Sequence, residues 1–422
     1  MRFKMEKERE NRTVEQAAER IAPLSQEAMR RARRRWDSIA KPLHSLGLLE
    51  DAVVQIAGIT GDPSYSIGRR AVAVFCADNG VVEEGVTQAG SEITALVAKN
   101  FTQGRASVCK MARVAHADVL PVDVGMKTDV EGVERRKTAR GTGNMTHGPA
   151  MTPQQARAAV EAGIDVARGL KERGFRIAAT GEMGIGNTTT SSAVVCVLLG
   201  AEVSDVTGRG SGLSDDGLLR KRRAIARAIR VNRPDPADPL DVLAKVGGFD
   251  LAALTGFFLG CAALRLPVLM DGFISAGGGG GAPPPPPPRG GGGGGGAPPA
   301  RGCAALRLPV LMAGFFSAGA ARAAARIAPL CADYILASHE SAEPAGKLLL
   351  RRLGKSPLIT AGMCLGEGTG AVAALPLLDM AFAVYRDMST FGEIEMEAYR
   401  PFPESEYEEQ PVSRGPENEK RK

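Results

Sequence analysis

The sequence has few aromatic residues, few histidines and no paired cysteines, and each shortage argues against a class of protein. Only 5% of the 422 residues are aromatic, which leaves few platforms on which nucleic-acid bases could stack. The four histidines lie far apart and the seven cysteines form no CxxC pair, so we expect no metal site and free thiols in a reducing compartment. No apolar run approaches the roughly 18 residues that a membrane helix needs, and the charged first residues do not resemble a signal peptide. We therefore expect a cytoplasmic protein that binds no metal, membrane or nucleic acid.

The rest of the composition is ordinary for a globular protein. Hydrophobic residues make up 44% of the chain and charged residues 24%. The length suffices for one large α/β domain, with or without a small appendage. The net charge of +6 includes a run of arginines at 30–35 on a predicted helix. A nucleic-acid patch and a solvated helix face both fit this run, and the scarcity of aromatic residues favours the solvated face.

Short apolar runs alternate with helical patterns along the chain. Five runs end at polar or glycine-rich turns and predict strands at 71–78, 118–125, 176–181, 266–273 and 332–339. Helical patterns separate them, for example at 92–113 and 152–174. The alternation predicts an α/β fold, a Rossmann-like parallel sheet with helices on both faces. Ligands of such sheets bind beyond the carboxyl ends of the strands.

Two glycine-rich loops, each built around one glutamate, are the most informative motifs. They read GEMGIGNTTT at 181–190 and LGEGTGAV at 365–372, and each precedes a run of small helix-forming residues. Glycines let the backbone approach a phosphate, and a helix N-terminus favours its negative charge. Because a carboxylate repels phosphate, Glu182 and Glu367 are expected to face another part of an anionic ligand. The pattern predicts an enzyme in which at least one carboxylate handles a proton.

Neither loop carries the signature of a common nucleotide-binding enzyme. The first loop lacks the GK[ST] ending of a P-loop, which argues against ATP chemistry. No clean GxGxxG follows the first predicted strand with an acidic residue about 20 residues further on, which argues against a dinucleotide-dependent oxidoreductase.

One segment occurs twice in the middle of the chain. GCAALRLPVLMDGFISAG (260–277) recurs as GCAALRLPVLMAGFFSAG (302–319), with Ala313 in the place of Asp271. The glycine- and proline-rich stretch between the copies, 278–301, cannot form a packed core. A recent duplication or a sequence-assembly error explains this pattern better than a structural repeat. The sheet offers one strand position, and we expect the first copy there because it keeps Asp271 and an intact preceding helix.

The two glycine loops belong to an ordered set of motifs that runs from about residue 15 to residue 400. The set comprises CADNGVVEEGVTQAGSEIT (76–94), DVGM (123–126), GTGNMTHGPAMT (141–152), GEMGIGNTT (181–189), GRGSGLSDDGLLRK (208–221), DGF (271–273), ASHESAEP (337–344) and LGEGTGA (365–371). Together these motifs resemble the family of nicotinate-nucleotide:dimethylbenzimidazole phosphoribosyltransferases, which make the lower-ligand nucleotide of cobalamin.

The resemblance implies how the chain is divided. Residues 46–373 would form the large catalytic domain, and residues 13–45 with 374–400 a small helical domain made from the two chain ends. The resemblance also implies a homodimer, and the reaction requires no cofactor. The polar, proline-containing stretch 403–422 is expected to be disordered.

The resemblance further implies a reaction. The 5-phosphoribosyl group of nicotinate mononucleotide would move to 5,6-dimethylbenzimidazole, giving α-ribazole 5′-phosphate and nicotinate. Nicotinate leaves as a neutral pyridine and needs no general acid, whereas the incoming base must lose an N–H proton. Glu367 matches the family's catalytic glutamate and is expected to take that proton; the alternative is a loop-bracing glutamate. Glu182 is expected near the ribose, where it could hold a hydroxyl or stabilise positive charge, or could brace its own loop.

Motif positions also supply candidate binding residues. The phosphoribosyl group is expected to lie against Gly184, Ile185, Gly186, Asn187, Thr188, Gly208, Gly210, Lys221 and Ser341. The aromatic base is expected to lie against Gln88, Ser91, Met363 and Leu365. Asp78, Asp123 and Asp271 end predicted strands and are candidates for lining the site; Asp78 and Asp123 could instead cap the helices that follow.

The chain departs from the commonest family pattern at two places near the expected base. It reads GSE at 90–92 where many relatives read PQE, and Cys364 replaces an arginine often found before LGEG. The reaction type should survive both changes, but adenine, another benzimidazole or a phenolic acceptor stays open as the accepted base. An inactive or regulatory relative that binds the mononucleotide without turnover is the other alternative.

Overall fold

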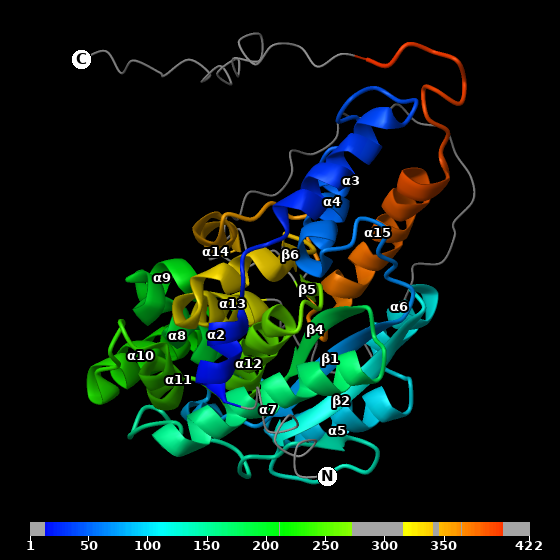
Figure 1. Cartoon of the computed structure of the whole chain (residues 1–422). Coiled ribbons are helices and arrows are strands. Elements are labelled where there is room, and N and C mark those ends of the chain that lie inside the picture. Colours follow the sequence, from blue (N-terminus) through cyan, green and yellow to red (C-terminus); the bar gives the residue numbers. More distant parts are fainter. Residues whose placement is uncertain (1–12, 211, 272–314, 341–345, 364, 400–422) are drawn as a thin grey trace, which may run out of the picture.

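The computed structural model describes residues 13–210, 212–271, 315–340, 346–363 and 365–399 (Figure 1). Ser341, Cys364, the insertion at 278–301 and the C-terminal stretch 403–422 lie outside the described residues.

Within these ranges, six parallel strands form the central sheet, in the order β3-β2-β1-β4-β5-β6. The strands are β1 (Arg70–Ala77), β2 (Ala117–Gly125), β3 (Glu134–Arg135), β4 (Ile177–Met183), β5 (Val268–Met270) and β6 (Ile335–Ala337). Every residue of β1 and β4 is buried, as expected for central strands covered on both faces. The strand order reverses between β1 and β4, and ligands bind at such a reversal in open α/β sheets.

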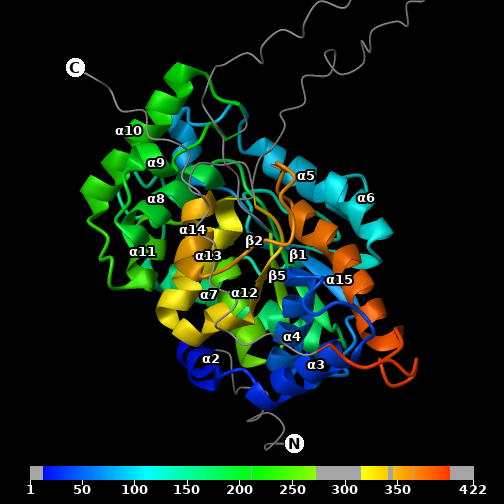
Figure 2. The same ribbon diagram turned by 90° about the horizontal axis from the view of Figure 1, so that it is seen from above.

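Helices cover both faces of this sheet, which confirms the predicted Rossmann-like α/β fold. They are α2 (Val14–Arg20), α3 (Gln26–Ser38), α4 (Leu48–Thr60), α5 (Glu92–Thr102), α6 (Ser107–Val114), α7 (Pro153–Glu172), α8 (Asn187–Leu199), α9 (Val203–Val206), α10 (Asp215–Asn232), α11 (Pro239–Val246), α12 (Phe249–Ala263), α13 (Phe315–Ile327), α14 (Gly346–Leu353) and α15 (Thr369–Asp387). Figure 2 shows α5, α6 and α15 on one side of the strands, and α7, α12 and α13 on the other.

Two predicted boundaries differ from the structure. The helical pattern at 92–113 is interrupted, because the chain turns at Gly104 with a φ of +65° between α5 and α6. The first glycine loop begins later than expected, since β4 continues through Met183 and Glu182 pairs with Phe75 of β1. Glu182 therefore lies near the end of a buried strand rather than in a loop.

Helices α3 and α15, which lie far apart in the sequence, form a group with α4 (Figure 1). The guanidinium of Arg35 on α3 donates to the carbonyls of Tyr385, Arg386 and Met388 at the C-terminus of α15, at 3.0, 3.2 and 3.1 Å. A cation at this end of a helix satisfies carbonyls that have no intrahelical partner. The other arginines of the run at 30–35 are exposed, as expected for a solvated helix face.

The strand position in the sheet is filled by the first copy of the duplicated segment, as its intact preceding helix predicts. β5 ends at Met270 within the copy at 260–277, and α12 precedes it. α13 begins at Phe315, within the second copy. The two copies therefore supply different elements of one sheet-and-helix unit.

Deleting residues 272–313 should give a folded and more stable protein. The deletion removes 42 residues and joins Asp271 to Gly314, so that the chain reads LPVLMDGFFSAG once. Shortening the connection between β5 and α13 lowers the entropy cost of bringing them together, by about 3 kcal/mol on the length dependence of loop closure. Urea denaturation of the two chains measures the difference, and a shortened chain that is less stable would show that the segment contributes to the fold.

Candidate active site

Acidic side chains gather at the carboxyl ends of the central strands. Glu182 lies at the end of β4, Asp78 follows β1, Asp123 lies in β2 and Asp271 follows β5. All four are nearly inaccessible to solvent, with exposed fractions of 1–2%. Parallel strands end at one edge of the sheet, so side chains far apart in sequence come together there.

The Glu367 loop has an unusual backbone. Gly366, Glu367 and Gly368 all have positive φ, at 81°, 60° and 96°. Two of these are glycines, for which the conformation is easy, but Glu367 adopts it against steric resistance. Non-glycine residues held in this way cluster at functional sites. The side chain is buried, and its Oε2 accepts a hydrogen bond of 3.2 Å from the N–H of Val108 near the start of α6.

The two glycine motifs lie directly against each other. A Cβ added to Gly181 would lie 2.4 Å from the carbonyl oxygen of Glu367, and one added to Gly368 would lie 3.0 Å from the carbonyl oxygen of Thr180. Glycine at these positions therefore lets the Glu367 loop rest on β4 beside Glu182. This contact brings the Glu367 loop against the strand that carries Glu182, 185 positions earlier in the sequence.

Burial makes both glutamates reluctant to ionise. Burial raises the pKa of Glu182 well above its ordinary value, and the neighbouring carboxyls of Asp250, Asp271 and Glu367 raise it further. Asn187 donates from Nδ2 to Glu182 Oε2, which lowers the pKa of this carboxyl, whereas Oε1 has no hydrogen-bond partner among the described residues. Burial also raises the pKa of Glu367, and the charge of Asp271 acts in the same direction. Raised pKa values of this kind are typical of groups that exchange protons.

The start of α8 provides an electropositive end to the cluster. Gly186, with a φ of +89°, precedes the helix, and Lys221 of α10 places its Nζ 2.7 Å from the hydroxyl of Thr188. Lys221 is only 1% exposed, and Gly210 of the motif at 208–221 lies beside both side chains. A buried ammonium at a helix N-terminus is a suitable place for a phosphate.

Other residues predicted to bind the phosphoribosyl group already have contacts within the protein. Gly184 packs against Asp250 and the carbonyl of Ala77. The N–H of Ile185 donates to the hydroxyl of Thr94 at 3.2 Å, so a phosphate contact at this N–H would require that bond to break. Gly208 lies two positions before Gly210 in the same motif. Ser341 lies outside the described residues.

The predicted base-binding residues fall into two groups. Met363 and Leu365 are partly buried and directly precede the Glu367 loop. Ser91 lies at the start of α5, and Gln88 donates from Nε2 to the carbonyl of Gly212. Gln88 therefore joins Gly212, in the motif at 208–221, to the segment between β1 and α5.

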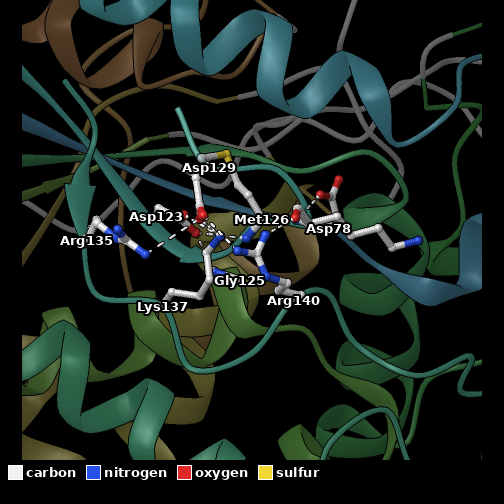
Figure 3. Close-up of polar contacts among 9 residues, drawn as sticks. Asp78, Asp123, Gly125, Met126, Asp129, Arg135, Lys137 and Arg140 are labelled. Atoms are coloured by element: carbon white, nitrogen blue, oxygen red, sulfur yellow. Dashed lines mark hydrogen bonds and ion pairs between the residues drawn. The ribbon is translucent and has the colours of Figure 1, made fainter. Parts of the chain in front are cut away.

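Asp78 and Asp123 both bind the segment that follows β2 (Figure 3). Asp123 Oδ1 accepts from the N–H groups of Gly125 and Met126, and its Oδ2 lies 3.0 Å from Lys137 Nζ. Asp78 Oδ2 accepts from the N–H of Lys127 at 2.7 Å. Both carboxylates thus brace this segment, and in these bonds neither caps a helix.

Two buried residues of the site, Asn79 and Asp250, were not predicted from the sequence. Asn79 donates from Nδ2 to Asp250 Oδ2 at 3.2 Å, and burial raises the pKa of Asp250 to about 7. Asp250 lies in the first turn of α12, after two glycines, where an ordinary helix-starting aspartate gives the same sequence pattern. Asn79 stands next to Asp78 in the CADNG motif, which is the signal that could have pointed to it.

The described residues contain no group of three or more histidine, cysteine, aspartate or glutamate side chains that could hold a metal ion. Within the same ranges, none of the helices has the length and apolar character needed to cross a membrane.

Comparison with known proteins agrees with the motifs. A family model described as phosphoribosyltransferase matches residues 21–279 and 299–396, and its gap coincides with the low-complexity insertion. Nicotinate-nucleotide–dimethylbenzimidazole phosphoribosyltransferase from Ruminiclostridium cellulolyticum is 44% identical over 391 residues, which cover 92% of this chain and 99% of the relative. The enzyme of the same name from Desulforudis audaxviator is 46% identical over 376 residues, or 88% and 95% of the two chains.

A solved structure resembles the whole fold. The crystal structure of CobT from Thermus thermophilus superposes with a TM-score of 0.75 at 36% identity, over 88% of this chain and 100% of the other. With the family model and these relatives, it shows that the chain belongs to the nicotinate-nucleotide–dimethylbenzimidazole phosphoribosyltransferase family.

Proposed function

We propose that this protein transfers the 5-phosphoribosyl group of nicotinate mononucleotide to 5,6-dimethylbenzimidazole, as a step of cobalamin biosynthesis. The products are α-ribazole 5′-phosphate and nicotinate. The names of the relatives support this reaction. The observation that carries it in this chain is the seating of the Glu367 loop on β4, at the end of the sheet where the buried Glu182 also lies.

The reaction exchanges one C–N bond for another at the ribose C1′. A ring nitrogen of dimethylbenzimidazole attacks C1′ with its lone pair, and the bond from C1′ to the pyridinium nitrogen breaks. Nicotinate keeps that electron pair, which neutralises its ring. The new nucleotide sheds its positive charge by giving the proton of its other ring nitrogen to a carboxylate. Attack from the face opposite the leaving group converts the β linkage to an α linkage.

Glu367 is the carboxylate that we assign to this proton. Its burial and raised pKa make it a better base than an exposed glutamate. Glu182, whose Oε1 has no partner among the described residues, is assigned to the ribose or to the positive charge that develops at C1′. The 5′-phosphate is assigned to the start of α8, between Gly186, Thr188 and Lys221.

Replacing Lys221 with methionine should weaken binding of nicotinate mononucleotide. Methionine keeps much of the buried volume but removes the ammonium that lies 2.7 Å from Thr188. We expect KM for the mononucleotide to rise on the order of 10–100-fold, the loss of one charged hydrogen bond, with a smaller change in kcat. Initial-rate kinetics with saturating dimethylbenzimidazole measure this. Arg230→Met, a replacement of a cation in the last turn of the same helix, serves as control and should leave KM unchanged.

Product analysis tests the reaction itself. Purified protein is incubated with nicotinate mononucleotide and dimethylbenzimidazole, and nicotinate and α-ribazole 5′-phosphate are followed by chromatography. Adenine and a phenol run in parallel as other acceptors. Product with dimethylbenzimidazole supports the proposal, product with another acceptor alone corrects the substrate, and a folded protein that binds the mononucleotide without turnover indicates an inactive relative.

Three further properties belong to the same proposal. We propose that the protein acts as a homodimer in the cytoplasm. Residues 46–373 would form its catalytic domain, and residues 13–45 with 374–400 its small helical domain. The contacts of Arg35 with the end of α15 support the pairing of the two chain ends.

A further inference from the structure

The carboxylate of Asp271 accepts three hydrogen bonds from backbone N–H groups of the Glu367 motif. Its Oδ2 accepts from the N–H of Gly368 at 3.1 Å, and its Oδ1 accepts from the N–H groups of Gly370 and Ala371 at 2.9 and 3.1 Å. These N–H groups belong to the start of α15, where helix geometry leaves donors without partners. Gly368, the residue in the N-cap position, has no side chain to supply an acceptor. A carboxylate at the end of β5 therefore caps a helix that starts nearly 100 residues later.

This cap acts on the residue next to Glu367. Glu367 is held in a left-handed conformation with a φ of 60°, which costs a non-glycine residue roughly 1–2 kcal/mol. Asp271 fixes the backbone just after Glu367, and Val108 holds the carboxylate itself at 3.2 Å. Together they fix both the backbone and the side chain of Glu367.

Asp271 is also hydrogen-bonded to β4, the strand that carries Glu182. The N–H of Asp271 donates to the hydroxyl of Thr180 at 2.8 Å, and Thr180 precedes Glu182 by two residues on β4. The hydroxyl of Thr180 also lies 3.2 Å from that of Ser317 on α13. On the other side, the imidazole of His339 packs against Gly370 with its Nδ1 3.8 Å from Asp271 Oδ1. The chain of contacts from β4 through Asp271 to α15 is thus continuous and buried.

We propose that Asp271 is a positioning residue for the reaction, which holds the Glu367 carboxylate in place through the first turn of α15. The proposal rests on the function assigned to Glu367 above. The duplicated segment carries a natural comparison, because its second copy has Ala313 at the equivalent position and could not make this cap.

A double-mutant cycle between Asp271→Asn and Glu367→Gln tests the proposal. Asparagine keeps one acceptor oxygen but presents N–H donors to an N–H group of α15, so Glu367 should shift. We expect Asp271→Asn to lower kcat on the order of 10–100-fold, since small misplacements of a reacting group have large effects. In the Glu367→Gln background the same change should cost less than about threefold, because the residue acts through Glu367. Binding of nicotinate mononucleotide, measured by calorimetry, should be unaffected in every variant.

Hydrogen exchange at the Val108 amide gives a readout that does not depend on turnover. This amide is bonded to Glu367, and its exchange should accelerate in Asp271→Asn and in Asp271→Ser, the variant to use if asparagine prevents folding. Asp238→Asn is the matched control, since Asp238 caps α11 through the N–H groups of Leu240 and Asp241. It should change neither kcat nor Val108 exchange.

Two results would overturn the proposal. One is an equal loss of kcat from Asp271→Asn in both backgrounds, and the other is unchanged exchange at Val108. Absence of product from the wild-type protein would instead refute the proposed function, and the exchange experiment would still decide whether Asp271 holds Glu367.

Discussion

Replacing Glu367 with glutamine should lower kcat by about 10²–10⁴-fold, the range associated with loss of a general base. Glutamine has nearly the same shape and retains an oxygen that can accept from the N–H of Val108. The main change is therefore the loss of proton acceptance at one carboxylate. Chromatographic assay of α-ribazole 5′-phosphate at saturating substrates measures kcat directly.

The pH dependence gives an independent check on this residue. Burial and Asp271 raise the pKa of Glu367, so its ionised, basic form is lost at a higher pH than for an exposed glutamate. The wild-type rate should fall as the pH decreases through that raised pKa, and this limb of the profile should be absent from Glu367→Gln. Glu202→Gln, at the exposed start of α9, should behave as the wild type. A Glu367→Gln enzyme with near-normal kcat would leave Glu367 as a loop-bracing residue.

The sequence predicted the strands that carry this site much better than the contacts between distant segments. Strand signals are local, so β1, β2 and β4 were predicted to within two residues at either end. β5 and β6 are only three residues long, shorter than their apolar runs, and the two-residue β3 has no apolar pattern at all. Apolar runs mark burial, and burial extends beyond the residues that pair in a sheet.

Contacts between distant segments could not be predicted from any local pattern. The motifs indicated that Glu182 and Glu367 belong to one site, but the seating of Glu367 on Gly181 depends on how α15 packs against β4. The same holds for the bond from Val108 to Glu367 and for the cap that Asp271 forms. A glycine in a strand pattern is the one local hint, because it often marks the close approach of another backbone.

Replacing Gly181 with alanine should impair catalysis although it adds a single methyl group. Gly181 has an ordinary negative φ, so alanine meets no backbone strain there. Its Cβ, however, would lie 2.4 Å from the carbonyl oxygen and 2.9 Å from the carbonyl carbon of Glu367, closer than real Cβ contacts. Because backbone rather than a flexible side chain is in the way, the Glu367 loop must move. A displacement of about 1 Å at a reacting group costs on the order of 10²-fold in kcat.

Steady-state kinetics with Gly169→Ala as the control separate this effect from a general response to alanine. Gly169 lies in α7, and no atom of a neighbouring element in the described ranges comes within 4 Å of the added Cβ, so its replacement should leave kcat unchanged and raise stability by about 0.4–1 kcal/mol. In Gly181→Ala we expect the loss in kcat with little change in KM for nicotinate mononucleotide, because the phosphate is assigned to Lys221 and the start of α8 and not to the Glu367 loop. A folded Gly181→Ala enzyme with wild-type kcat would show that the position of the Glu367 loop on β4 does not limit the reaction. The assignment of the base would then rest on the burial and raised pKa of Glu367 and not on the place of its loop.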